Sequence, residues 1–142
     1  MNLEDAVLMA IAEGMCNPKF IAKHLNVSLD DVKVAIDNLE AEGLIVKRIR
    51  GLIFKKEVYE LTKRGFERVE SIKEELRKVA EDFKTAYESR DRMRLERLYH
   101  DYYHFIPLMI MFGLIDAIWL STLLSDFDVI EGVDDLDFDM GF

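Results

Sequence analysis

The strongest constraint on the fold lies in residues 28–61, where a helical pattern stops abruptly and two β-rich runs follow. Ser28 with Asp31 three positions later is close to a capping box, which marks the start of a helix. Gly43 suits the left-handed conformation that commonly follows a helix end. Between these two signals one helical face is apolar: Val32, Ile36 and Leu39.

The two β-rich runs are residues 44–46 and residues 58–61, and the segment KRIRGLIFKKE lies between them. Gly51 is the residue best suited to the turn, so the pattern predicts an antiparallel hairpin. Upstream, apolar periodicity in residues 3–14 and the helix-start signal at Pro18 predict two short helices. Downstream, LTKRGFERVE opens a long helix.

The order helix, helix, capped helix, hairpin, helix over residues 3–70 resembles winged helix-turn-helix regulators of the MarR, ArsR and PadR kind. The resemblance is carried by IAKHLNVSLDDVKVAIDNLEAEGLI and VYELTKRGFERVE. The usual sequence pattern of these bacterial and archaeal regulators is LGVS, then LEEEGLI at the end of the next helix, then Y-x-LT-x-x-G after the wing. The resemblance implies a mainly α fold with a small β-hairpin, a winged-helix domain over residues 1–70, and a DNA-binding transcriptional regulator.

Beyond residue 70 the sequence predicts a helical extension over residues 71–125. Apolar residues recur at helical spacing, the register breaks at residues 89–94, and Pro107 predicts a new helix start. Small winged-helix regulators usually dimerise through added helices, so the extension is expected to form a homodimer. The expected dimer interface comprises Leu76, Val79, Phe83, Tyr87, Leu98, Tyr102, Phe112, Ile115 and Trp119.

Residues 105–124, FIPLMIMFGLIDAIWLSTLL, contain a single charge, Asp116. A helix that is apolar all round is buried in protein or in lipid, and this segment is long enough to span a bilayer. Arginines before it and acids after it also fit the orientation of a membrane span. A dimer core and a membrane tether both stay open, and the dimer core is favoured because added helices usually dimerise.

The net charge of −9 is carried by the C-terminal end of the chain. Residues 1–70 hold 11 Lys/Arg and 12 Asp/Glu, residues 71–104 hold 8 of each, and residues 105–142 hold no Lys or Arg and 8 Asp/Glu. The acidity therefore does not exclude a nucleic-acid partner for the first 70 residues. The acidic tail, residues 126–142, is either a solubilising end or a segment that competes with DNA or docks on a basic partner.

The resemblance makes the outer face of the third helix the base-reading surface, but acids dominate that face. Its positions are Leu29, Asp30, Lys33, Val34 and Asp37. Carboxylates are repelled by the phosphates that dominate DNA affinity, so the predicted contact moves to the hairpin. Seven cations lie on or beside it: Lys47, Arg48, Arg50, Lys55, Lys56, Lys63 and Arg64. The expected DNA-binding residues are Lys33, Lys47, Arg48, Arg50, Lys55 and Lys56.

The hairpin tip, IRGLIF, is apolar where such tips are normally polar. Strand alternation buries only about half of these side chains within one subunit. The others are expected to pack on the added helices, on a second subunit or on a partner, and insertion of Phe54 between bases is a further alternative.

The rest of the chain offers little chemistry. Glu96, His100 and His104 share one helical face, either as metal ligands or as a polar interface stripe. No nucleophile, phosphate loop or paired-carboxylate motif stands out, so no enzyme, metal or cofactor is expected. One cysteine and no recognisable signal peptide suit the cytoplasm, and the absence of Gln with 33% charged residues suits a thermophile.

The alternative function is a winged-helix protein–protein interaction module without specific DNA binding. A membrane tether through residues 105–124 stays open for either function.

Overall fold

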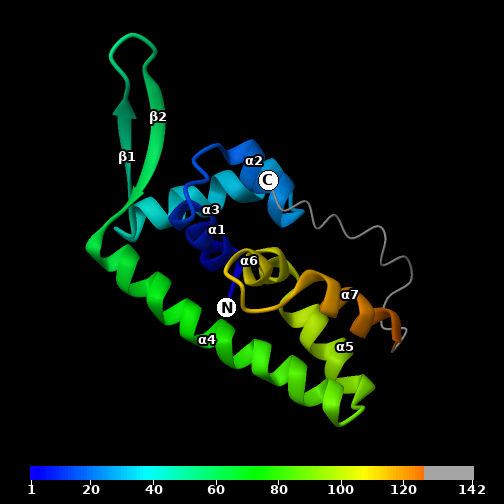
Figure 1. The fold of residues 1–142 in the computed structure, drawn as a ribbon. Coiled ribbons are helices and arrows are strands. Elements are labelled where there is room, and N and C mark those ends of the chain that lie inside the picture. The colour runs from blue at the N-terminus through cyan, green and yellow to red at the C-terminus, as the bar shows by residue number, and fades with distance from the viewer. Residues whose placement is uncertain (127–142) are drawn as a thin grey trace. The chain divides into compact units, whose positions relative to one another are not determined.

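The structure is a computed structural model that describes residues 1–126, apart from the side chains of residues 123, 124 and 126 (Figure 1). These residues are mainly helical, with a two-stranded antiparallel sheet. The prediction of a mainly α fold with a small β-hairpin is therefore confirmed. The roles predicted for residues 127–142 lie outside the described residues. The chain divides into an N-terminal unit, Met1–Lys73, and a C-terminal unit that begins at Glu74.

The N-terminal unit contains three short helices, a hairpin and the first part of a long helix. These elements are α1 (Leu3–Ala12), α2 (Pro18–Leu25), α3 (Leu29–Ala41), β1 (Ile45–Arg50), β2 (Lys56–Leu61) and α4 (Lys63–Glu88). Helices α1 and α2 both pack against α3, and the hairpin contacts α1 through β2 and α3 through β1. The core of this unit includes the fully buried side chains of Leu8, Met9, Ile21, Leu25, Leu39 and Ile45.

The helix ends lie where the sequence signals placed them. Pro18 occupies the first turn of α2, behind Asn17, whose side chain accepts from a backbone N–H. The Ser28 hydroxyl accepts from the Asp31 backbone N–H at 3.1 Å and so caps α3. Gly43 follows α3 with φ +76°, a left-handed conformation that glycine adopts without a Cβ clash. Local chemistry therefore determines the boundaries of α2 and α3.

An ion pair between buried Asp5 and partly exposed Arg68 joins the two ends of the N-terminal unit. Asn2 and Asp5 form a reciprocal capping box at the start of α1. The same Asp5 carboxylate is buried and accepts from Arg68 of α4, with Nη2 at 2.8 Å from Oδ2 and Nε at 3.1 Å from Oδ1. A two-pronged guanidinium–carboxylate contact is directional, so it sets the rotation of α4 against α1 in this unit.

In the C-terminal unit the remainder of α4 is followed by α5 (Arg92–Asp101), a 3₁₀ turn η1 (Tyr103–Phe105), α6 (Ile106–Met111) and α7 (Ala117–Asp126). The helix break predicted at residues 89–94 is confirmed. Arg90 adopts a left-handed φ of +57°, and Asp91 then caps α5 by accepting from the Arg94 backbone N–H. The Arg94 side chain also binds Asp82 of α4 at 3.1 Å.

The expectation of one continuous apolar helix over residues 105–124 is wrong. Helix α6 ends at Met111, and Gly113 follows with φ +73°. Asp116 then accepts from the Trp119 backbone N–H at 2.9 Å at the start of α7. A glycine that ends one helix and an aspartate that caps the next divide the segment, so Asp116 is not a charge inside a helix. Among the described residues, no helix is long and apolar enough to cross a membrane.

The Asp5 contact predicts a large effect of one substitution. Asp5→Ala removes the carboxylate, leaves Arg68 without its partner and deletes half of the capping box. We expect the free energy of unfolding to fall by about 2 kcal/mol, a moderate value because Arg68 is partly exposed. Urea unfolding measures the change. The control is Glu70→Ala, which removes an exposed i,i+3 pair with Lys73 and should change the free energy by less than about 0.5 kcal/mol. Equal effects of the two substitutions would contradict the conclusion that the Asp5–Arg68 contact stabilises the fold more than an exposed ion pair does.

Candidate nucleic-acid interface

The strand register divides the hairpin side chains between two faces. Ile45 lies opposite Leu61, and Arg50 lies opposite Lys56. Because side chains alternate along a strand, one face carries four charged residues and two valines: Arg48, Arg50, Lys56, Glu60, Val46 and Val58. We call this the cationic face. The other, which we call the cleft face, carries Ile45, Lys47, Ile49, Glu57, Tyr59 and Leu61.

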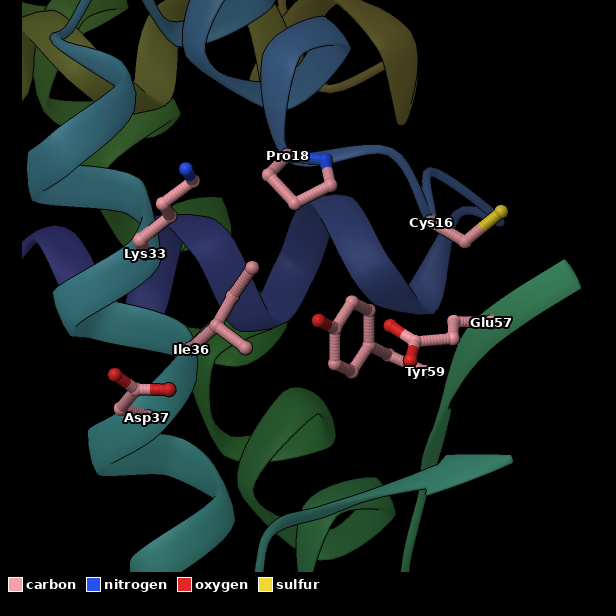
Figure 2. A pocket seen from close by; sticks show the side chains of 7 residues that line it. All are labelled: Cys16, Pro18, Lys33, Ile36, Asp37, Glu57 and Tyr59. Carbon is pink, nitrogen blue, oxygen red and sulfur yellow. The ribbon is translucent and has the colours of Figure 1, made fainter. Parts of the chain in front are cut away.

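The cleft face of the hairpin looks toward α3 across a cleft of about 370 Å³ (Figure 2). The cleft is lined by Cys16, Pro18, Lys33, Ile36, Asp37, Glu57 and Tyr59. One ammonium group and two carboxylates leave its wall unsuited to a phosphate. Since Glu57 and Tyr59 line the cleft, the alternate side chains of β2 point away from it. The cationic face is therefore turned away from α3.

Ion pairs occupy part of the cationic face. The Glu60 carboxylate accepts from Arg50, with Nε at 3.0 Å, and lies 3.5 Å from Nε of Arg48. These contacts lower the pKa of Glu60, chiefly through the hydrogen bond from Arg50, so Glu60 stays ionised across the neutral range. Exposed ion pairs are weak, so an incoming phosphate can displace Glu60 from the two guanidinium groups.

The other predicted cations lie in different settings. Lys47 is on the cleft face, 3.9 Å from Glu57 and with its Nζ 6.0 Å from the Tyr59 ring centroid. No carboxylate of residues 1–125 lies within 4.0 Å of Lys33, Lys55 or Lys56. Hence the structure brings Arg48, Arg50 and Lys56 together and places Lys33 and Lys47 on the cleft side. Of the two flanking cations, Arg64 donates to the Glu42 carbonyl at 3.0 Å.

The acids of α3 are solvent-exposed: Asp30, Asp31, Asp37, Glu40 and Glu42. Lys33 and Val34 are exposed among them, whereas Leu29 is half-buried. The side chains predicted at the base-reading positions therefore reach solvent, apart from Leu29. The charge of the acids still opposes a phosphate backbone, and none of them lies on the cationic face. Asp37 lines the cleft beside the hairpin, whereas Asp31 lines a separate cleft with Glu4.

The residues predicted for a dimer interface fall into two groups. Leu76, Val79, Phe83 and Ile115 are buried within the single chain, and Tyr87, Leu98, Tyr102, Phe112 and Trp119 are half-buried. The Tyr87 and Trp119 rings meet edge-on, with centroids 5.9 Å apart. Apolar periodicity does not distinguish a subunit's own core from a surface between subunits. The interface stays a prediction, and its half-buried members are the ones that a partner could reach.

The C-terminal unit also holds a tyrosine and histidine cluster. Burial raises the pKa of Tyr99 to about 12, with a further contribution from Tyr103, whose ring centroid lies 5.5 Å away. Glu96 accepts from Nε of Arg92 at 3.1 Å rather than joining His100. Within the part of the chain that the structure describes, no group of three His, Cys, Asp or Glu side chains could hold a metal ion.

The role of Glu60 is what the sequence reasoning missed at this site. Its contacts with Arg48 and Arg50 depend on the strand pairing that places all three residues on one face, which the sequence alone does not show. Comparison of the chain with family models, curated proteins and solved structures finds no match. The inference about this surface therefore rests on its geometry and charge.

A charge-neutral substitution at Glu60 should strengthen nucleic-acid binding. Glu60→Gln releases Arg48 and Arg50 for phosphates, and we expect about a threefold gain in affinity for duplex DNA at low salt. Since the pKa of Glu60 is lowered, the gain should be the same at pH 6 and pH 8. Fluorescence anisotropy with a labelled duplex measures both.

The matched control is Glu57→Gln, which makes the same change of charge on the cleft face. A smaller gain is expected from it. Equal gains from the two substitutions would mean that only net charge matters and that the cationic face has no special role.

Proposed function

We propose that this chain is a DNA-binding transcriptional regulator of the winged-helix type, in which the hairpin provides the main phosphate contacts. The observation that carries the proposal is the cationic face, on which Arg48, Arg50 and Lys56 share one exposed side of a two-stranded hairpin. Lys55 follows at the tip. Such a row of cations suits the spaced charges of a nucleic-acid backbone.

The assignment to the winged-helix type is supported by the order of the elements and their packing. Helices α2 and α3 pack on each other and are joined by a short turn in which Asn26 has a left-handed φ of +58°. A hairpin and a long helix follow, as in the regulators that residues 3–70 resemble. In such domains the second helix of the pair usually reads bases. Here the acids of α3 argue for a hairpin-dominated mode instead.

The two hairpin faces explain how an acidic α3 and DNA binding are compatible. A duplex bound on the cationic face contacts the side of the hairpin that points away from α3. At physiological salt the screening length is about 8 Å, so acids beyond the hairpin repel the duplex only weakly. Specific base contacts are not part of this mode, and selectivity would come from the shape of the DNA.

A homodimer is part of the proposal. The half-buried residues Tyr87, Leu98 and Trp119 of the C-terminal unit, together with exposed Met93 and Ile118, offer apolar area to a second copy. Two hairpins in one assembly would double the phosphate contacts, and paired sites along the duplex would follow from the two-fold symmetry.

One observation favours a second candidate function. Five exposed carboxylates on and just after α3 form a surface that suits a basic protein partner better than DNA. In that case the chain is a winged-helix protein–protein interaction module without specific DNA binding. Salt dependence distinguishes the two candidates, because binding through several phosphates weakens steeply as the salt concentration rises.

Removing the cationic face should weaken DNA binding and its salt dependence together. We expect the triple variant Arg48→Gln, Arg50→Gln and Lys56→Gln to reduce the log–log salt slope by about 3, since each phosphate contact contributes roughly one unit. The control is Lys78→Gln, Lys84→Gln and Arg97→Gln, which removes the same charge from exposed sites of the C-terminal unit. Anisotropy titrations from low to physiological salt measure the slope. Equal slopes for the two variants, or no binding by the wild type at low salt, would favour the interaction module.

Neutralising the acids of α3 should have little effect on DNA binding. For Asp30→Asn, Asp31→Asn and Asp37→Asn together we expect less than about a twofold change at physiological salt, because these groups lie on α3, and the cationic face of the hairpin is turned away from α3. The same titration measures it. A gain of about tenfold or more would show that α3 does approach the duplex, and would contradict the hairpin-dominated mode.

A further inference from the structure

The hairpin tip exposes a run of apolar side chains to solvent. Leu52 is 99% exposed, Phe54 88% and Ile53 85%, and Ile49 at the end of β1 is 66% exposed. Single exposed apolar residues are common, but four within six positions form a continuous patch of the kind that marks an interaction site. Phosphate contacts do not need these side chains, so the proposed DNA binding leaves them without a role.

The backbone holds this patch outward. In the N-terminal unit the tip lies at the end of the hairpin that is remote from α1, α2 and α3 (Figure 1). Gly51 turns the chain with φ +110°, and a Cβ there would lie 2.2 Å from the Phe54 carbonyl oxygen. Only glycine allows this close approach, so the three residues Leu52 to Phe54 are confined to a tight loop. The patch is therefore compact and protruding rather than a groove, and we call its loop residues, Leu52 to Phe54, the apolar point.

Cations surround the base of the apolar point. Arg50 and Lys56 lie directly opposite each other across the strands, and Lys55 adjoins them. Like charges in directly opposed positions repel, and this pair is closer to the tip than the nearest carboxylate along either strand, Glu57. Arg50 is also bound to Glu60, so an external anion would offset the repulsion by displacing that exposed carboxylate. From the tip of the hairpin inward, the side chains are first apolar, then cationic, and then of mixed charge.

We infer that the hairpin tip docks on an anionic lipid bilayer. A bilayer presents negative headgroups over hydrocarbon, so Leu52, Ile53 and Phe54 would enter the acyl boundary while Arg50, Lys55 and Lys56 contact lipid phosphates. The layering of the tip matches the layering of the membrane surface. This is peripheral attachment through a loop, and it does not depend on any membrane-spanning helix.

Other occupants fit the tip less well. DNA presents its phosphates outermost, so an apolar point would meet the charged backbone before it met a base. On a second copy of this chain, the clefts of about 370 and 270 Å³ in the N-terminal unit are candidates to receive the tip. Each is lined by two carboxylates, Asp37 with Glu57 and Glu4 with Asp31, which do not suit three apolar side chains. The bilayer is the occupant that matches both the apolar and the cationic parts.

Vesicle flotation with the full chain tests the inference. The vesicles are phosphatidylcholine alone or phosphatidylcholine with about 30% phosphatidylglycerol, and the bound fraction is measured in each. We expect binding to the anionic vesicles and at least about tenfold weaker binding to the neutral ones. Leu52→Ser, Ile53→Ser and Phe54→Ser together should lower binding to anionic vesicles by about tenfold or more. Arg50→Gln, Lys55→Gln and Lys56→Gln together should lower it similarly.

The control is Phe20→Ser, Val34→Ser and Phe66→Ser, which removes three exposed apolar side chains outside both the tip and the proposed dimer surface and should leave binding within about twofold. The tip side chains touch little, so the tip serine variant should keep the wild-type thermal unfolding midpoint. Absence of wild-type flotation, full binding by the tip serine variant, or an equal loss in the control overturns the inference.

DNA binding separates this inference from the proposed function. The tip serine variant should keep wild-type DNA affinity, and duplex DNA should compete with anionic vesicles because Arg50 and Lys56 serve both. Flotation without salt-sensitive DNA binding would leave lipid docking standing and remove the proposed function. Loss of DNA binding by the tip serine variant, with no flotation of the wild type, would indicate insertion between bases and overturn lipid docking.

Discussion

The register of the β1–β2 hairpin is the constraint on which the functional surface depends. With Arg50 opposite Lys56, Arg48, Arg50 and Lys56 gather on one face and Lys47 joins Glu57 and Tyr59 on the other. A slip of one residue would exchange the two faces and turn the arginines toward α3. The tight turn at Gly51 and the burial of Ile45 at the opposite end both hold the register. A packing requirement and a steric requirement therefore select one distribution of charge.

The ion pairs of the cationic face are weak enough for an external anion to replace Glu60. Glu60 holds two arginines, but every group of this set is partly exposed, so the pairs contribute little to stability. By contrast, the contact of buried Asp5 with Arg68 is two-pronged and structural. The N-terminal unit thus places its stable ion pair between helices and its labile ones on the hairpin. Such a division leaves the hairpin free to bind anions without unfolding the domain that carries it.

Local signals predicted much of the fold because their causes are local. The caps at Asn2 and Ser28, the first-turn Pro18 and the left-handed Gly43 each depend on a few neighbouring residues. The segment over residues 105–124 shows a conflict between local signals and average composition. Its apolar composition suggested one helix, although Gly113 and Asp116 carry the same stop and start signals that were recognised elsewhere. The average composition of the segment does not show the effect of these two single residues, one of which ends a helix while the other caps the next.

The amino-acid sequence by itself determined the boundaries of α2 and α3, the hairpin with Gly51 at its turn, and an acidic third helix followed by a cationic hairpin. Each of these depends on neighbouring residues, which the sequence displays directly. Only the tertiary structure decided which cations share a face, that Glu60 holds two of them, that Leu76, Val79 and Phe83 are buried within one chain, and that Leu52 to Phe54 are left in solvent. Those outcomes depend on strand pairing and on what covers each side chain, which are relations between residues far apart along the chain.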